Sequence, residues 1–216
     1  MANFWLGVGA AIGILAGMVL HEYAHARVAV AMGDRTPIAH GRLTLNPKAH
    51  VDPVGTIIMP ILFLLPIMTG KNLGMIFGYA KPVPLNPRAM KDQRLAPFYV
   101  ALAGPLTNFA LALAAGAALK FGKPSLGGTT FLLLSGFLTV NCFLALINAL
   151  PIPPLDGSRL LGLFLKPQTV WKMEELGQYI LLFLVALFLF FRGVIAAMTD
   201  PVCSAASFNL FSGCVL

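Results

Sequence analysis

Near its N-terminus the chain carries an apolar segment that is long enough to cross a membrane and that ends in ionisable side chains. The segment Phe4–Leu20 has no charged residue, and the sequence His-Glu-Tyr-Ala-His follows it directly at 21–25. A helix needs about 20 predominantly apolar residues to span a bilayer. Ionisable groups at membrane depth cost free energy and are usually retained for function. The sequence therefore predicts a membrane helix with a functional site at its C-terminal end.

The spacing of the two histidines is typical of metal binding. On an α-helix His21 and His25 lie about one turn apart on one face, so both imidazoles can reach the same metal ion. Glu22 projects from the neighbouring position, where it can hold and deprotonate a water molecule. This is the HExxH arrangement of zinc hydrolases, with two ligands and a general base. We therefore predict that His21 and His25 bind one Zn²⁺ per chain and that Glu22 is the catalytic base.

The composition identifies an integral membrane protein. The chain of 216 residues is 58% hydrophobic and only 11% charged, whereas soluble domains carry about 25% charged residues. Four runs are long enough to span a membrane: Phe4–Met32, Leu95–Leu119, Thr129–Leu150 and Leu176–Met198. A fifth run, Val54–Thr69, is shorter and contains two prolines, so we expect a re-entrant or broken helical hairpin there. The predicted fold is an all-α polytopic membrane protein with about four transmembrane helices.

The segments between the spans are polar. Thr36–Leu45 is long enough for one or two short β-strands after the first helix. We expect residues 1–200 to form a single intramembrane domain and residues 201–216 to form a short C-terminal tail. Small residues inside the spans are expected to pack closely between helices. They are Gly9, Gly13, Gly17 and Cys142.

A second motif closes the third predicted span. The sequence Asn-Ala-Leu-Pro-Ile-Pro-Pro-Leu-Asp-Gly at 148–157 contains three prolines, which end a helix, and a glycine, which permits a tight turn. An isolated carboxylate beside a membrane helix would tend to be protonated, and a bound metal removes that tendency. Catalytic zinc sites use three protein ligands and keep one position for water. Asp156 is therefore the predicted third ligand.

Shared ligation of one metal places a demand on the topology. The end of the first span and the end of the third span must face the same side of the membrane, which requires that Leu95–Leu119 crosses and that Val54–Thr69 does not. Twelve Lys and Arg residues then lie on the metal side: Arg27, Arg35, Arg42, Lys48, Lys71, Lys81, Arg88, Lys91, Arg94, Arg159, Lys166 and Lys172. Three lie on the opposite side: Lys120, Lys123 and Arg192. This excess predicts that the metal end faces the cytoplasm.

With both motifs in place, the chain resembles the site-2 protease family of intramembrane zinc metalloproteases. The matching segments are 21–25, 148–157 and Ala-Gly-Pro-Leu-Thr-Asn at 103–108. Asp52–Gly55 and Tyr79–Pro84 look like the short prokaryotic members, which have no PDZ or CBS domains. The resemblance implies three helices around zinc in a prokaryotic cell membrane. It also implies cleavage of transmembrane protein substrates, often in regulated intramembrane proteolysis.

By position, the resemblance assigns zinc to His21, His25 and Asp156 and the role of base to Glu22. Asn148 matches the family asparagine that assists the substrate or transition state. A hydrogen bond from Asn148 to another helix is an equally open interpretation.

Four other polar residues are expected to have structural roles. We expect His40 and His50 to be loop residues and not ligands, and Asp52 to form a turn or cap. Asn108 is expected to hydrogen-bond between helices and to take no part in chemistry.

Two other functional classes also fit parts of the sequence. A metal-ion transporter is the alternative, because intramembrane His and Asp residues also line ion paths. It gives Glu22 no role as a base, and neither does a catalytically silent scaffold. The net charge of +7 lies in loops between the spans, so we expect no nucleic-acid partner. The substrate, the oligomeric state and a disulfide between Cys203 and Cys214 stay open from sequence.

Overall fold

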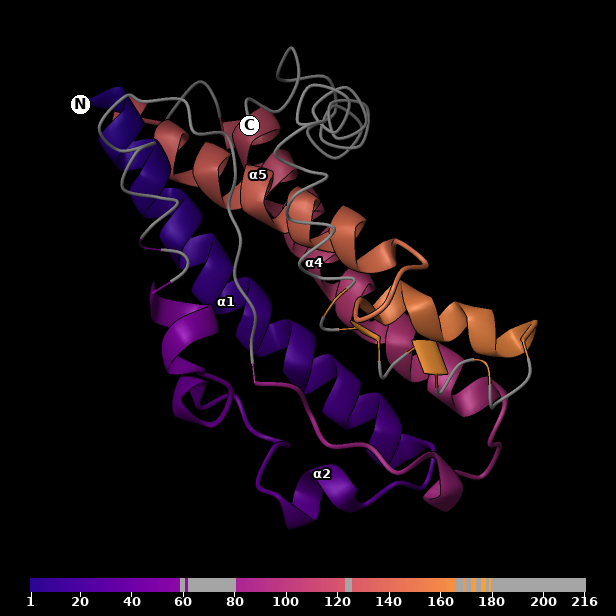
Figure 1. Ribbon diagram of the computed structural model, residues 1–216. Helices are drawn as coiled ribbons and strands as arrows, with labels where there is room; N and C mark the ends of the chain where they lie inside the picture. Colours follow the sequence, from indigo (N-terminus) through magenta and orange to yellow (C-terminus); the bar gives the residue numbers. More distant parts are fainter. Residues whose placement is uncertain are drawn as a thin grey trace.

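A computed structural model describes residues 1–58, 81–122 and 126–165, with the single positions 61, 169, 172, 173, 176, 177 and 179. Three long helices dominate it: α1 (Ala2–Ala31), α4 (Leu95–Gly122) and α5 (Gly128–Ala149). Each is long and apolar enough to cross a membrane. Every pair of them is in contact, which makes a three-helix bundle (Figure 1).

Short helical elements lie outside the bundle. They are α2 (Thr36–Ala39), η1 (Pro47–Ala49), η2 (Pro53–Ile58), η3 (Pro87–Ala89) and η4 (Asp156–Leu163). The first three predicted spans are thus confirmed to within a few residues. The predicted span Leu176–Met198 lies almost entirely outside the described residues, as do the tail and most of Val54–Thr69.

The prediction of strands within Thr36–Leu45 is wrong, because the described part of the chain contains no strand and this segment begins with α2. Local chemistry explains the helical turn. The Asp34 side chain accepts a hydrogen bond from Thr36 N at 2.9 Å, and Pro37 has a backbone angle that suits the first helical turn. Without a neighbouring strand to pair with, these local preferences decide the conformation.

Helices α1 and α5 run parallel and touch along a stripe of glycines. Each step of four residues on α1 meets a step of four residues on α5, which fixes the parallel direction. The contacting pairs are Gly9 with Leu133, Gly13 with Phe137, and Gly17 with Asn141. A Cβ atom at Gly9 would overlap the Leu133 carbonyl oxygen. The prediction that these glycines permit close helix packing is therefore confirmed.

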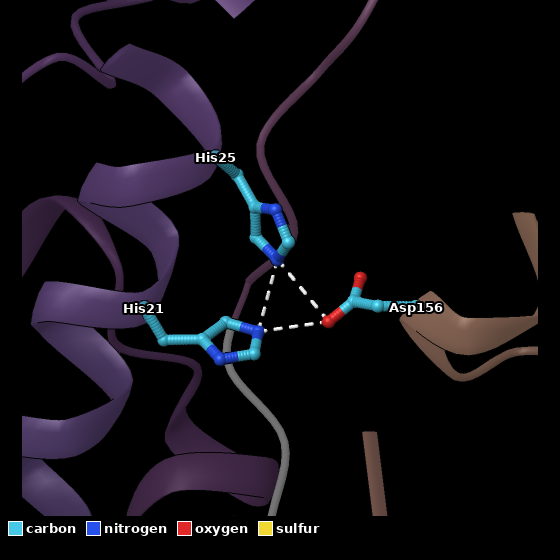
Figure 2. A group of neighbouring side chains, drawn as sticks. All are labelled: His21, His25 and Asp156. Carbon is cyan, nitrogen blue, oxygen red and sulfur yellow. Dashed lines mark hydrogen bonds and ion pairs between the residues drawn. The ribbon is translucent and has the colours of Figure 1, made fainter. Parts of the chain in front are cut away.

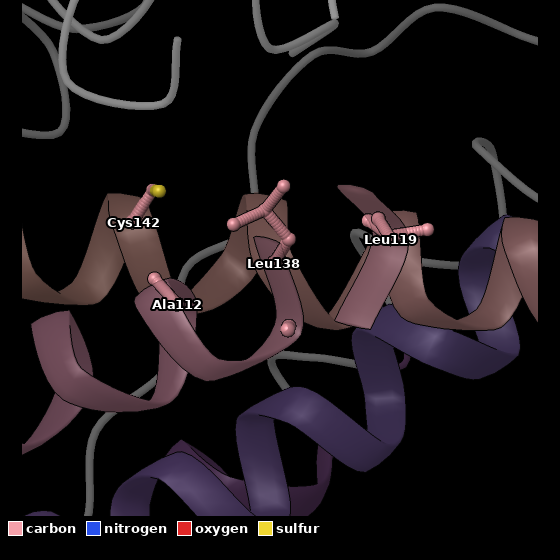
Figure 3. Close-up of a cluster of buried hydrophobic side chains, with 5 residues drawn as sticks. Ala112, Leu119, Leu138 and Cys142 are labelled. Atoms are coloured by element: carbon pink, nitrogen blue, oxygen red, sulfur yellow. The ribbon is translucent and has the colours of Figure 1, made fainter. Parts of the chain in front are cut away.

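Helices α4 and α5 form an antiparallel pair with an apolar core between them. Its buried members are Ala112, Ala115, Leu119, Leu138 and Cys142 (Figure 3). Cys142 is 1% exposed, which confirms its predicted place as a small buried residue. This core holds the two helices together at the end of the bundle away from His21 and His25 of α1.

Two carboxylates outside the bundle cap short turns and tie segments together. Asp52 accepts a hydrogen bond from Gly55 N at 2.8 Å and donates its own N–H to Thr56 Oγ1 at 3.0 Å, so its predicted capping role is confirmed. Asp34 also accepts a hydrogen bond from Asn86 N at 2.7 Å. That bond fixes the non-helical segment 81–86 beside the C-terminal end of α1 (Figure 1).

Candidate metal centre

Three side chains from distant parts of the chain converge at the C-terminal end of α1. His21 and His25 project from α1, and Asp156 is the first residue of η4 (Figure 2). Asp156 Oδ2 lies 2.9 Å from His21 Nε2 and 3.1 Å from His25 Nε2. The two Nε2 atoms lie 3.0 Å apart. The structure thus brings together the three residues predicted as ligands, close enough to hold one metal ion.

This convergence meets the demand that the sequence placed on the topology. α5 runs parallel to α1, so the chain leaves α5 at the same end of the bundle at which α1 ends. Gly157 follows Asp156 directly, and a Cβ atom there would overlap the carbonyl oxygens of Ala149 and Leu150. The glycine therefore lets the loop fold back against the end of α5 and carry Asp156 to the histidines.

The orientation of His25 is fixed by the main chain of α4. Its Nδ1 lies 2.6 Å from the carbonyl oxygen of Val100. A carbonyl oxygen can only accept a hydrogen bond, so Nδ1 carries a proton and Nε2 is the nitrogen available to a metal. Nε2 points at Asp156 (Figure 2). His25 is therefore held in the tautomer that binds a metal through Nε2.

The space between the imidazoles fits a metal ion. A Cβ atom built on Gly104 of α4 would lie 2.5 Å from His21 Nε2 and would overlap His25 Nε2. Glycine thus keeps empty the point on which both nitrogens converge. Two nitrogens and one carboxylate oxygen form a donor set used by catalytic zinc sites, whose ligand atoms lie about 2.0–2.2 Å from the metal. The residues present therefore suit Zn²⁺, the cofactor predicted from the sequence.

Burial shapes the electrostatics of the three predicted ligands. His21 and His25 are 7% and 5% exposed. Burial raises the pKa of the Asp156 carboxyl, but the adjacent His25 and His21 outweigh this effect and hold that pKa well below its usual range. Asp156 is therefore an ionised carboxylate, which is the form that coordinates a metal.

Glu22 lies on the same turn of α1 as His21 and is half-buried. Its Oε2 accepts a hydrogen bond from Val83 N at 3.2 Å. The carboxylate is therefore held toward the segment 81–86. No sequence pattern predicted this contact between a side chain and a main-chain N–H 61 positions apart.

The other predicted polar residues lie outside the group of three. Asn148 is in the last turn of α5, where its Nδ2 donates to Leu144 O at 3.0 Å; its role at the site stays a prediction. His40 is exposed, and His50 is buried with Nε2 against Thr44 O at 2.8 Å. Among the described residues, neither histidine belongs to a metal-binding group.

Two residues that matter to the site carried no predicted role. Gly104 lies in the segment 103–108 that resembles the family. The need for a glycine there becomes clear only from the packing of α4 against the histidines of α1. Asn141 is a polar residue in an apolar span. Because such a group costs free energy in a membrane, its presence there could have indicated a role at the site. Asn108 was expected to hydrogen-bond between helices. This is confirmed by its bonds to His21 and Asn141.

Comparison with known proteins identifies the family. No family model and no solved structure matches the chain. It is 36% identical over 184 residues to "Putative zinc metalloprotease YwhC" of Bacillus subtilis, which covers 82% of this chain and 78% of that protein. It is 33% identical over 182 residues to "Putative zinc metalloprotease Rip2" of Mycobacterium tuberculosis, covering 82% of this chain and 65% of the relative. With its two metal motifs and these relatives, the chain belongs to the site-2 protease family of membrane zinc metalloproteases.

Proposed function

We propose that this protein is an intramembrane zinc endopeptidase that hydrolyses peptide bonds in or near transmembrane segments of membrane-protein substrates. The observation that carries the proposal is the meeting of His21, His25 and Asp156 at the end of an apolar three-helix bundle, with Glu22 on the same helical turn. The relatives described above carry metalloprotease names, so the metal-ion transporter considered from the sequence has no support among them.

Each residue has a distinct role in the proposed reaction. His21, His25 and Asp156 would hold Zn²⁺, which when bound polarises a carbonyl group and lowers the pKa of a water molecule to about 7. Glu22 accepts the proton of the attacking water and then delivers it to the amine that leaves. The hydrogen bond from Val83 N orients the Glu22 carboxylate before substrate arrives.

Asn148 is the proposed contact to the substrate or transition state. It lies eight residues before Asp156, in the last turn of the helix that leads to the third ligand. The bond from its Nδ2 to Leu144 O holds the side chain along α5. Its amide can supply a hydrogen bond to charge that develops on the scissile carbonyl oxygen.

We also propose that the metal end of the bundle faces the cytoplasm of a prokaryotic cell. The excess of Lys and Arg on that side supports this orientation. Lys91 and Lys120 are exposed and lie near opposite ends of α4. A single cysteine at either position should react with a membrane-impermeant thiol reagent, and the two should react from opposite sides of the membrane. With intact cells, labelling of the Lys91 position from outside would contradict the orientation.

The function is tested with purified protein in proteoliposomes that contain a transmembrane reporter substrate. Wild-type protein should cleave the reporter in the presence of zinc. Glu22→Gln keeps the size of the side chain but removes the base, so it should bind zinc at wild-type stoichiometry and show no cleavage. Cleavage at the wild-type rate by this variant would refute the proposed role of Glu22.

A further inference from the structure

A chain of hydrogen bonds leads away from His21 through all three long helices. His21 Nδ1 lies 2.6 Å from Asn108 Oδ1 of α4. Asn108 Nδ2 donates to Asn141 Oδ1 of α5 at 3.0 Å. Asn141 Nδ2 donates to Phe137 O at 3.0 Å and to Gly13 O, back on α1, at 3.4 Å. The chain begins at a predicted metal ligand and ends at two main-chain carbonyl groups.

The interior of the bundle is shaped to hold the two amides. Asn108 and Asn141 are each 0% exposed. A Cβ atom at Gly17 would lie 2.6 Å from Asn141 Oδ1 and 2.9 Å from Asn108 Nδ2. A glycine on α1 therefore provides the room that the pair occupies. Buried amides cost free energy unless they are hydrogen-bonded, so a fully connected pair in an apolar bundle needs a reason beyond packing.

The donor and the acceptor in each of these hydrogen bonds are fixed by the contacts of Asn141. Carbonyl oxygens only accept hydrogen bonds, so the Asn141 group that faces Phe137 O and Gly13 O must be its NH₂. Asn141 Oδ1 then faces Asn108 and must accept from the Asn108 NH₂. The remaining Asn108 oxygen faces His21 Nδ1 and can only accept. His21 Nδ1 must therefore carry the proton.

We infer that Asn108 and Asn141 are positioning residues that hold His21 in the Nδ1–H tautomer and so direct the Nε2 lone pair at the metal position. His25 reaches the same tautomer through a single carbonyl, Val100 O. With both Nδ1 atoms protonated, the two Nε2 atoms, which now contact Asp156 Oδ2, are the nitrogens that can direct lone pairs at a bound metal ion. A hydrogen-bond acceptor on the far nitrogen also raises the basicity of the ligating nitrogen.

The arrangement couples the metal site to helix packing. Asn141 lies on α5, on the same face that meets the glycines of α1. Neither asparagine is one of the three groups that converge on the metal position. The inference rests on the proposed function only in that the site holds zinc, and its tests do not need proteolysis.

The first test reads the tautomer directly in the wild-type protein. ¹⁵N NMR of the histidine side chains in zinc-free full-length protein at neutral pH should show His21 protonated at Nδ1. His21 is assigned by the loss of its signals in His21→Ala. A wild-type His21 that carries its proton mainly at Nε2 would overturn the inference, whatever the fate of any asparagine variant.

The second test measures zinc affinity by competition with a chelator. Asn108→Leu removes the acceptor at similar volume and should weaken zinc binding about 10- to 100-fold. Asn108→Asp keeps an acceptor facing His21 and should recover part of that loss. Asn141→Leu should weaken binding in the same direction, because Asn108 then loses its fixed orientation.

Ser135→Ala is the matched control for loss of a buried polar group. Ser135 is 8% exposed on the same helix as Asn141, but its hydroxyl donates only within α5, to Phe131 O at 2.6 Å. This variant should bind zinc like the wild type. Folded Asn108→Leu and Asn141→Leu proteins with wild-type zinc affinity would refute the inference. A wild type that binds zinc tightly but cleaves no reporter would instead refute the proposed function alone.

Discussion

Replacing Gly104 with alanine should strongly weaken zinc binding while leaving the helices in place. The added methyl group would lie 2.5 Å from both Cε1 and Nε2 of His21 and would overlap Nε2 of His25. Side-chain carbons do not approach other heavy atoms within 3.0 Å, so the imidazoles must retreat by about half an ångström or more. Ligand positions tolerate errors of only about 0.5 Å, and the methyl group also fills space that the ion needs.

The expected loss in zinc affinity is at least about 100-fold, the upper end of what removing a ligand-orienting contact costs. Overpacking should also lower the free energy of unfolding of the zinc-free protein by about 1–3 kcal/mol. Zinc affinity is measured by chelator competition and stability by thermal unfolding in detergent. Gly128→Ala is the control, because a Cβ atom at Gly128 meets nothing within 4 Å. Wild-type zinc affinity in folded Gly104→Ala protein would refute the assignment of the metal position.

Three further substitutions test separate parts of the account. Val83→Pro removes the N–H that holds Glu22 and should lower kcat in the reporter assay while the zinc content stays unchanged. Val83→Ala keeps that N–H and should retain activity. Equal cleavage rates for the two variants would exclude this contact from catalysis. Asp156→Ala should lower the zinc content, and full retention of zinc would remove Asp156 from the ligand set. Burial raises the pKa of Asp34, but hydrogen bonds from Asn86 N and Thr36 lower that pKa by a larger amount. The net shift is therefore downward. The stabilisation by Asp34 is then present above the unfolded-state pKa of about 3.9 and lost as the pH falls through the lower folded-state value. Asp34→Asn should therefore destabilise the protein at pH 7, and thermal unfolding should show the difference from wild type shrinking in acid; a constant difference would contradict this role.

The parts of the fold that depend on local sequence could be predicted. The apolar runs that became α1, α4 and α5 are recognisable from length alone, because the bilayer sets a minimum number of apolar residues. The pairing of His21 with His25 follows from helix geometry within one turn. The contact of this histidine pair with Asp156 could be predicted because ionisable groups next to membrane spans cost free energy, and sharing one metal ion offsets that cost for both.

Some contacts between helices could not be predicted in the same way. The tautomer of His21 is set by Asn141, a residue on another helix, and by the main-chain carbonyl groups that Asn141 contacts. The reason for Gly104 exists only where α4 crosses the two histidines. The strand predicted in Thr36–Leu45 failed because a strand needs a pairing partner, whereas a capped turn needs only its neighbours.

The central claim is that one zinc ion held by this chain is required for proteolysis. It is tested most directly by removing zinc from the purified protein with a chelator and titrating it back while cleavage of a transmembrane reporter is followed. Cleavage should be absent without zinc, rise in proportion to added zinc and reach its maximum at one ion per chain. Glu22→Gln should take up the same single ion and remain inactive. Full cleavage by zinc-free protein, or cleavage by Glu22→Gln at the wild-type rate, would contradict the account.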